Sequence, residues 1–216
     1  MNGASNMSNM DAYLVSSGAI DSDNPIIQNK ARMLIEGTDS HIDRAIALFY
    51  AVRDGVRYNP YVKINDPEQY KASRVLQMGE GYCVQKAVLL CALARAAGMP
   101  ARLGFVDIKN YRMPDKLFSL LGTNHVLYHG YAALCINGIW VKATPAFNLE
   151  MCQDLRLPPV EFDGYRDALF SDKDLDGKPF IEYVNYRGFF DDVPLDDMLQ
   201  EGNTYYGTER MSFWEK

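Results

Sequence analysis

Residues 72–106 read ASRVLQMGEGYCVQKAVLLCALARAAGMPARLGFV, and this stretch decides the fold class. From Cys83 to Ala97 the residues are strong helix formers and most are apolar, so we predict a helix that is buried on almost all sides. Gly98 and Pro100 are residue types that end a helix. Residues 101–106 then have the composition of a strand. A central buried helix followed by a strand is therefore the predicted core.

The sequence before this stretch predicts two more helices. Asn24 followed by Pro25 is a helix-start signal, and apolar residues then recur at helical spacing as far as Gly37. A second helical pattern runs from Ser40 to Gly55. Each pattern has one apolar face, so we expect both helices to pack against the core.

The sequence after the stretch predicts a β-hairpin. Two β-prone runs are joined by Asn137-Gly138, the strongest short hairpin signal, and a two-residue loop sets the register of the strands. Continued pairing and the alternation of side chains then place four residues on one face. These residues are His129, Tyr131, Cys135 and Thr144.

The segments on either side of the hairpin are less regular. Residues 107–124 form a long connection, which we expect to be a functional lid or an irregularly packed loop. Past Pro145 the chain is rich in Asp-Gly and Pro turn signals, and a short strand is expected at 180–187.

Length, composition and charge set the broad class. The 216 residues are 48% hydrophobic and 23% charged, which predicts one globular domain over 11–216 after a flexible N-terminus at 1–10. The net charge of −6 offers no basic surface, so we expect no nucleic-acid partner. No apolar run is long enough to span a membrane, and no secretory signal precedes the domain. We therefore expect a cytoplasmic protein with no membrane partner and four reduced cysteines.

The predicted placement of Cys83 suits it to nucleophilic chemistry. Unpaired N–H groups at the start of a helix stabilise a thiolate, so we expect the pKa of Cys83 to lie below about 8.5. Gly81 gives the backbone freedom to turn and lets a substrate approach. A nucleophile also needs a proton carrier, and His129 opens a strand of the hairpin. On its own, however, a cysteine in such a helix is more often a core thiol than a nucleophile.

Two blocks of the chain resemble the transglutaminase-like superfamily. Residues 72–106 resemble its nucleophile segment, in which Gly-x-Cys opens the central helix. The run HGYAALCINGIWVKATPAF, from His129 onward, resembles its second block, in which a histidine begins one strand and an aspartate precedes a proline in the next. The resemblance assigns Cys83 as nucleophile and His129 as base, and it places Thr144 where the family has aspartate.

The resemblance implies a fold and a chemistry. The fold is α+β and papain-like, with N-terminal helices and the nucleophile helix packed on an antiparallel sheet. The chemistry is attack by a cysteine on a peptide, isopeptide or glutamine side-chain amide, through an acyl-enzyme and a Cys-His dyad or atypical triad. We expect hydrolysis of a protein or peptide substrate, without a cofactor or metal. The alternatives are a non-catalytic binding module and an amine-transferring cross-linker.

Supporting residues are less clearly indicated. Threonine can orient an imidazole but cannot stabilise its charge, so Asn148 is a second candidate for the third position. Gln77 is a candidate oxyanion donor by analogy with papain-like proteases, although a surface role is the simpler interpretation. More remote acids are Glu150, Glu161 and Asp163.

A possible calcium loop is also visible after the hairpin. Asp172, Asp174 and Asp176 have calcium-loop spacing, but the twelfth position is Tyr183 in place of a carboxylate. We therefore expect a turn here without calcium binding.

Overall fold

The structure is a computed structural model that describes residues 10–215. The predicted flexible terminus at 1–10 therefore lies, except for Met10, outside the described residues. The helical elements, where η marks a short 3-10 helix, are η1 (Asp11–Tyr13), α2 (Pro25–Ile35), α3 (His41–Gly55), η2 (Pro67–Tyr70), α4 (Ala72–Met78), α5 (Cys83–Ala96), α6 (Asp115–Leu121), α7 (Leu149–Leu155), α8 (Leu195–Tyr206), α9 (Thr208–Met211) and η3 (Ser212–Glu215). The strands are β1 (Arg57–Tyr58), β2 (Glu80–Gly81), β3 (Ala101–Asn110), β4 (His125–Ile136), β5 (Ile139–Ala143) and β6 (Ile181–Phe190). No helix among residues 10–215 has the length and apolarity that a membrane span requires.

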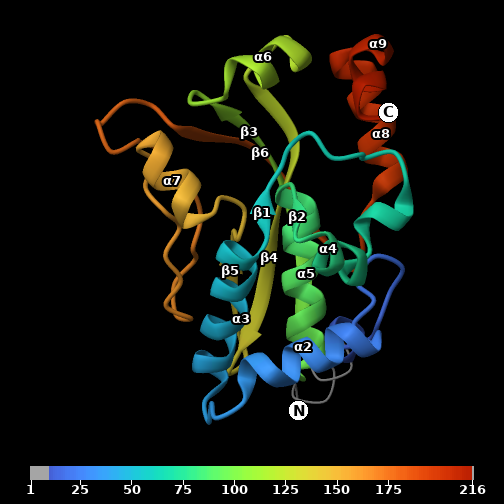
Figure 1. Ribbon diagram of the computed structural model, residues 1–216, viewed down its shortest axis with the longest axis vertical. Coiled ribbons are helices and arrows are strands. Elements are labelled where there is room, and N and C mark those ends of the chain that lie inside the picture. Colours follow the sequence, from blue (N-terminus) through green and yellow to red (C-terminus); the bar gives the residue numbers. More distant parts are fainter. Residues whose placement is uncertain (1–9, 216) are drawn as a thin grey trace, which may run out of the picture.

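The four long strands form one antiparallel sheet in the order β5-β4-β3-β6. A two-stranded parallel pair, β1-β2, lies beside it and leads into α5. Helix α5 lies against β4 and β3, and α2, α3 and α4 pack around α5 (Figure 1). This arrangement confirms the predicted α+β class, with a central helix on an antiparallel sheet.

Helix α5 is the centre of the core, as its composition predicts. Every residue from Cys83 to Arg95 is buried. Burial of a large aliphatic side chain contributes about 1.5–3 kcal/mol relative to its exposure, and Leu89, Leu90 and Leu93 are almost completely buried. The helix is surrounded by apolar contacts because it has no polar face to present to water.

The hairpin has the predicted register. Cys135 pairs with Trp140 and Ile136 with Ile139, and the turn residue Asn137 has φ 51. Positive φ is tolerated best by Asn and Gly, which is why this dipeptide is such a reliable turn signal. Helices α2 and α3 also begin as predicted, α2 at Pro25 and α3 directly after Ser40.

The predicted boundaries around 107–124 are wrong. Strand β3 continues to Asn110 because it goes on pairing with β6 beyond Val106, and the rest of the segment contains α6. Leu117 of α6 is buried against Met211 and Trp214 of the C-terminal segment. The predicted loop is thus mostly regular structure.

The calcium-like loop is held by internal bonds. Oδ1 of Asp174 accepts hydrogen bonds from the N–H groups of Asp176 and Lys178, both at 2.9 Å. The carboxylate of Asp176 forms an ion pair with Arg156 at 2.6 Å. Among residues 10–215, no group of three or more His, Cys, Asp or Glu side chains is placed to hold a metal ion.

Candidate active site

Cys83 is the first residue of α5 and is 5% exposed. The backbone enters the helix through Gly81, where a Cβ would lie 3.0 Å from Oε1 of Gln85. The same Oε1 accepts a hydrogen bond from the N–H of Tyr82 at 3.1 Å, which caps the helix. Glycine therefore leaves room for the cap that fixes the thiol at the helix N-terminus.

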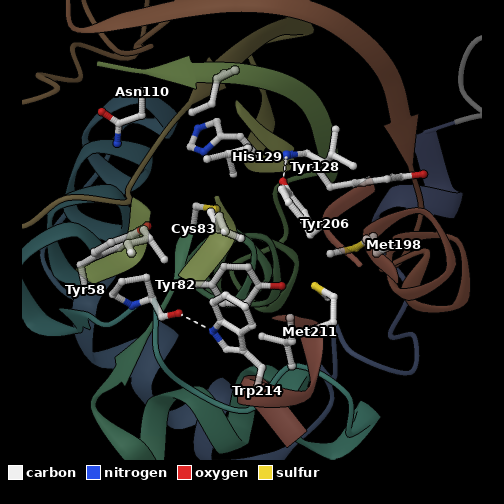
Figure 2. Close-up of a pocket in the computed structure, with 18 of the residues that line it drawn as sticks. Tyr58, Tyr82, Cys83, Asn110, Tyr128, His129, Met198, Tyr206, Met211 and Trp214 are labelled. Carbon is white, nitrogen blue, oxygen red and sulfur yellow. Dashed lines mark hydrogen bonds between the residues drawn. The ribbon is translucent and has the colours of Figure 1, made fainter. Parts of the chain in front are cut away.

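His129 lies on β4 and lines the same cavity as Cys83. The strand crosses the first turn of α5 at Gly130, where a Cβ would lie 2.8 Å from Cα of Val84. Tyr128 has φ 53, an uncommon value for a residue other than glycine, so the strand changes direction immediately before the histidine. Figure 2 shows the imidazole of His129 close to the thiol of Cys83 at one wall of a cavity that both residues line.

The environment of Cys83 raises its pKa. Burial is the largest cause and brings the pKa to about 11, while hydrogen bonds from the backbone N–H groups of Gly130, Val84 and Cys83 itself lower it less. The sequence-based expectation of a pKa below about 8.5 is therefore wrong for this enclosed structure. The helix N-terminus does supply donors to the sulfur, but the loss of water has a larger effect.

The environment of His129 lowers its pKa to about 3, and burial is again the cause. The ring packs at 5.2 Å between centroids against Phe170. Its Nε2 atom is buried and has no hydrogen-bond partner among the described residues. At neutral pH the enclosed pair is consequently a neutral imidazole beside the protonated thiol of Cys83.

Thr144 is fully buried, and its Oγ1 also has no hydrogen-bond partner among residues 10–215. Strands β4 and β5 pair as far as Ala132 and Ala143. The pairing therefore stops one residue pair before Thr144. The expected hydrogen bond from the imidazole of His129 to Oγ1 of Thr144 is not formed. Of the four residues predicted to share a face, only His129 lines the cavity.

Asn148 has a structural position. Its Oδ1 accepts a hydrogen bond from the N–H of Tyr58 at 2.6 Å. Its Nδ2 donates to the carbonyl oxygens of Arg53 and Val56, both at 2.8 Å. Because both ends of the amide are engaged, Asn148 holds β1 in place and is not the orienting partner of His129.

The other candidates lie away from the thiol. Gln77 is exposed and lines a polar groove on the surface that does not include Cys83. Glu161 pairs with Arg53 at 3.1 Å, and Asp163 accepts hydrogen bonds from the backbone of Arg166. Glu150 is exposed.

Three tyrosines beside Cys83 were not singled out from the sequence. Tyr70 donates its hydroxyl proton to the carbonyl of Ile64 at 2.9 Å and therefore accepts from the hydroxyl of Tyr82 at 2.8 Å. The hydroxyl of Tyr58 has no hydrogen-bond partner among the described residues, and burial raises its pKa well above the usual value. Tyr58 follows an ordinary helix end in a chain with 14 tyrosines, so no sequence signal distinguishes it.

The cavity has a volume of about 130 Å³. Cys83 and His129 form its polar end, and the remaining wall is mostly apolar. The C-terminal segment, residues 195–215, contributes Met198, Met211 and Trp214 to the wall opposite the thiol (Figure 2). The site is thus enclosed by a part of the chain remote in sequence from both reactive residues.

Hydrogen bonds fasten the C-terminal segment over the cavity. Nε1 of Trp214 donates to the carbonyl of Pro60 at 2.8 Å. The hydroxyl of Tyr206 accepts from the N–H of Leu127 at 2.7 Å and donates to the carbonyl of His125 at 3.1 Å. These bonds join α8 and η3 to opposite sides of the site.

A charged network connects α8 with the strand that carries His129. Arg187 pairs with Asp107 at 2.6 Å and with Glu201 of α8 at 2.8 Å. Asp107 also accepts a hydrogen bond from the N–H of Tyr128, and the hydroxyl of Tyr128 donates to Glu201 at 2.6 Å. The unusual backbone before His129 is therefore held by the same groups that hold α8.

The family model for the transglutaminase-like superfamily matches residues 28–145, which include the whole of α5 and the hairpin. The chain belongs to the transglutaminase-like superfamily. No protein in the curated collection of characterised sequences matches it.

Two solved structures are similar to this transglutaminase-like chain. One is described as "a Putative Cysteine Protease from Cytophaga hutchinsonii", with 17% identity, a TM-score of 0.50, and coverage of 84% of this chain and 54% of that chain. The other is described as "a putative protease from Parabacteroides distasonis", with 13% identity, a TM-score of 0.41, and coverage of 63% of this chain and 25% of that chain. The first shares the fold, and this chain spans about half of its length.

Proposed function

We propose that this protein is a cysteine enzyme that acts on amide bonds, with Cys83 as nucleophile and His129 as general base and acid. One observation carries the proposal: a thiol at the start of a buried helix and an imidazole from the adjoining strand line the same cavity. The remaining cysteines, Cys91, Cys135 and Cys152, do not line it. Membership of the superfamily supports this assignment.

The proposed reaction begins from the neutral pair. His129 accepts the proton of the thiol as Sγ of Cys83 attacks the amide carbonyl, and the backbone N–H of Cys83 stabilises the oxyanion. The hydroxyl of Tyr58 is a second available donor, because no other group engages it. The imidazolium then protonates the leaving amine, which leaves a thioester on Cys83.

Hydrolysis completes the proposed cycle. Neutral His129 takes a proton from water, which attacks the thioester and releases a carboxylic acid and the thiol. An amine in place of water would give cross-linking, which is the second candidate. The unpartnered Oγ1 of Thr144 favours a dyad over a triad, and a binding module that has lost catalysis is the third candidate.

Thiol labelling tests the nucleophile assignment, and Cys152 is the matched control. Both Cys83 and Cys152 are buried, and burial raises the pKa of each to about 11. If His129 activates Cys83, iodoacetamide labels Cys83 at least about tenfold faster than Cys152, and His129→Ala removes the difference. Mass spectrometry of the labelled peptides measures both rates. Faster labelling of Cys91 or Cys152 in the folded wild type would overturn the assignment.

The expected substrate is a protein or peptide, handled without a cofactor or metal ion. A cytoplasmic location and a single domain over 11–216 complete the proposal. All four cysteines are buried and free of disulfide bonds, so no thiol is blocked covalently in the labelling experiment.

A further inference from the structure

The residues that line the cavity indicate which chemical groups of a substrate it can hold. Its lining residues, all within residues 10–215, include no Lys, Arg, Asp or Glu. Leu117, Leu121, Val126, Met198 and Met211 are among the apolar residues that line it. A charged group placed there would lose its hydration and find no opposite charge.

Apart from the hydroxyl of Tyr58 and the side-chain amide nitrogen of Asn110, the polar side chains of this wall away from Cys83 and His129 are engaged already. The hydroxyl of Tyr206 has one donor and one acceptor partner, and the indole N–H of Trp214 is bonded to Pro60. The hydroxyls of Tyr70 and Tyr82 bond to each other. Uncharged polar groups of a substrate would therefore find few partners away from the thiol.

The size of the cavity limits the group that fits. An apolar cavity of about 150 Å³ in a protein interior holds one benzene molecule. The cavity here has about 130 Å³. One phenyl or branched aliphatic group fills this space.

We propose that the enzyme selects amides whose acyl part carries one uncharged apolar group of about the size of a benzene ring. This inference rests on the proposed function and names its substrate class. The apolar group lies beneath α8 and η3, and the scissile carbonyl lies at Sγ of Cys83. The S–C bond forms as the C–N bond breaks, the thiol proton passes through His129 to the leaving amine, and water then releases the carboxylic acid.

Binding to the Cys83→Ala protein tests the selectivity without catalysis. The probes are phenylacetamide, 4-methylpentanamide, acetamide and succinamate, which place an apolar, a branched aliphatic, a minimal and a charged group on the same amide. We expect phenylacetamide and 4-methylpentanamide to bind at least about tenfold more tightly than the other two, measured by ligand-observed NMR titration. Equal binding of succinamate, or no binding of the apolar amides, would overturn the inference.

Two variants locate the binding in the cavity, each made in the Cys83→Ala protein. Val126→Phe fills the space and Leu199→Glu adds a charge to its wall, so both reduce the preference for phenylacetamide at least about fivefold. Val184→Phe, on an exposed part of β6 outside the cavity, leaves the preference unchanged. The inference would also be overturned if Val126→Phe and Val184→Phe changed the preference for phenylacetamide equally and Leu199→Glu kept the preference of the Cys83→Ala protein.

Ammonia release by the intact protein separates the two proposals. Selective binding by Cys83→Ala with no ammonia released from any of the four amides or from peptide amides contradicts the enzyme and leaves the selectivity standing. Release that is equally fast for succinamate and phenylacetamide contradicts the selectivity and leaves the enzyme standing.

Discussion

Two buried polar side chains beside α5 have opposite environments. At the C-terminal end of the helix, Arg95 donates to the carbonyl oxygens of Ala101, Val15 and Asp191 at 2.7–3.0 Å. At the N-terminal end, Nε2 of His129 has no partner among residues 10–215. Buried polar groups normally find partners, so the arginine, which donates from each of its three nitrogens, stabilises the fold, whereas the histidine with its unpartnered Nε2 is available for chemistry.

The largest expected effect is the difference in amide hydrolysis between variants of the two cysteines of α5, Cys83 and Cys91. Cys83→Ala removes the nucleophile, so amide hydrolysis falls by about 10³-fold or more. Cys91→Ala shortens a side chain buried in the core, so it lowers the free energy of unfolding by about 1–2 kcal/mol and leaves hydrolysis intact. Steady-state rates and urea unfolding measure the two effects. Retained amide hydrolysis in Cys83→Ala would contradict the assignment of Cys83 as the nucleophile.

Removal of the arginine should affect stability alone. Arg95→Met leaves three carbonyl oxygens without a donor, so we expect the free energy of unfolding to fall by about 3 kcal/mol. Urea denaturation followed by circular dichroism measures it. The ratio of the Cys83 labelling rate to the Cys152 labelling rate should match that of the wild type. A tenfold fall in this ratio would show that Arg95 at one end of α5 affects the reactivity of Cys83 at the other.

Thr144 offers a way to give the histidine a partner. In Thr144→Asp, a carboxylate that reaches His129 would stabilise the imidazolium by about 1–3 kcal/mol, so labelling of Cys83 near neutral pH would become about 10–100 times faster. The pH dependence of iodoacetamide labelling measures the change. Thr144→Val removes an oxygen that has no partner, and its labelling should equal that of the wild type. An unchanged profile in a folded Thr144→Asp protein would exclude Thr144 as the third position.

The smallest expected effect is a pH dependence of stability. The folded pKa of His129, about 3, lies below the unfolded value of about 6.5, so the unfolded chain binds more protons between these values. Stability is therefore lost as the pH falls below about 6.5. Between pH 8 and pH 5.5 the wild type should lose about 1 kcal/mol more than His129→Gln in urea unfolding. Equal losses would mean that His129 is hydrated in the folded protein.

Local sequence signals predicted the elements that depend on local physics. The Asn137-Gly138 turn requires positive φ, and the apolar run after Cys83 can be satisfied only by burial, so both were confirmed. The boundary at Asn110 was missed because β3 is extended by pairing with β6, which lies more than 70 residues later in the chain. Pairing between distant segments leaves no short-range pattern to detect.

The candidate site was predicted less completely than the fold. Cys83 and His129 were placed correctly at the start of a helix and in a strand, and the structure brings them to one cavity. The pKa of Cys83 was predicted in the wrong direction, because the burial that raises it depends on tertiary packing. The structural use of Asn148 follows from contacts with Tyr58 and Val56 that lie about 90 positions away, and no spacing rule indicates them.

The hydrogen bond from Trp214 to Pro60 has a kinetic consequence. A ligand that binds only when the C-terminal segment is open has an apparent Kd equal to its intrinsic Kd divided by the open fraction. A segment open about 1% of the time would thus weaken every ligand about 100-fold, whatever its fit to the cavity. For a substrate and product that pass only through the opened segment, kcat cannot exceed the frequency with which this bond breaks.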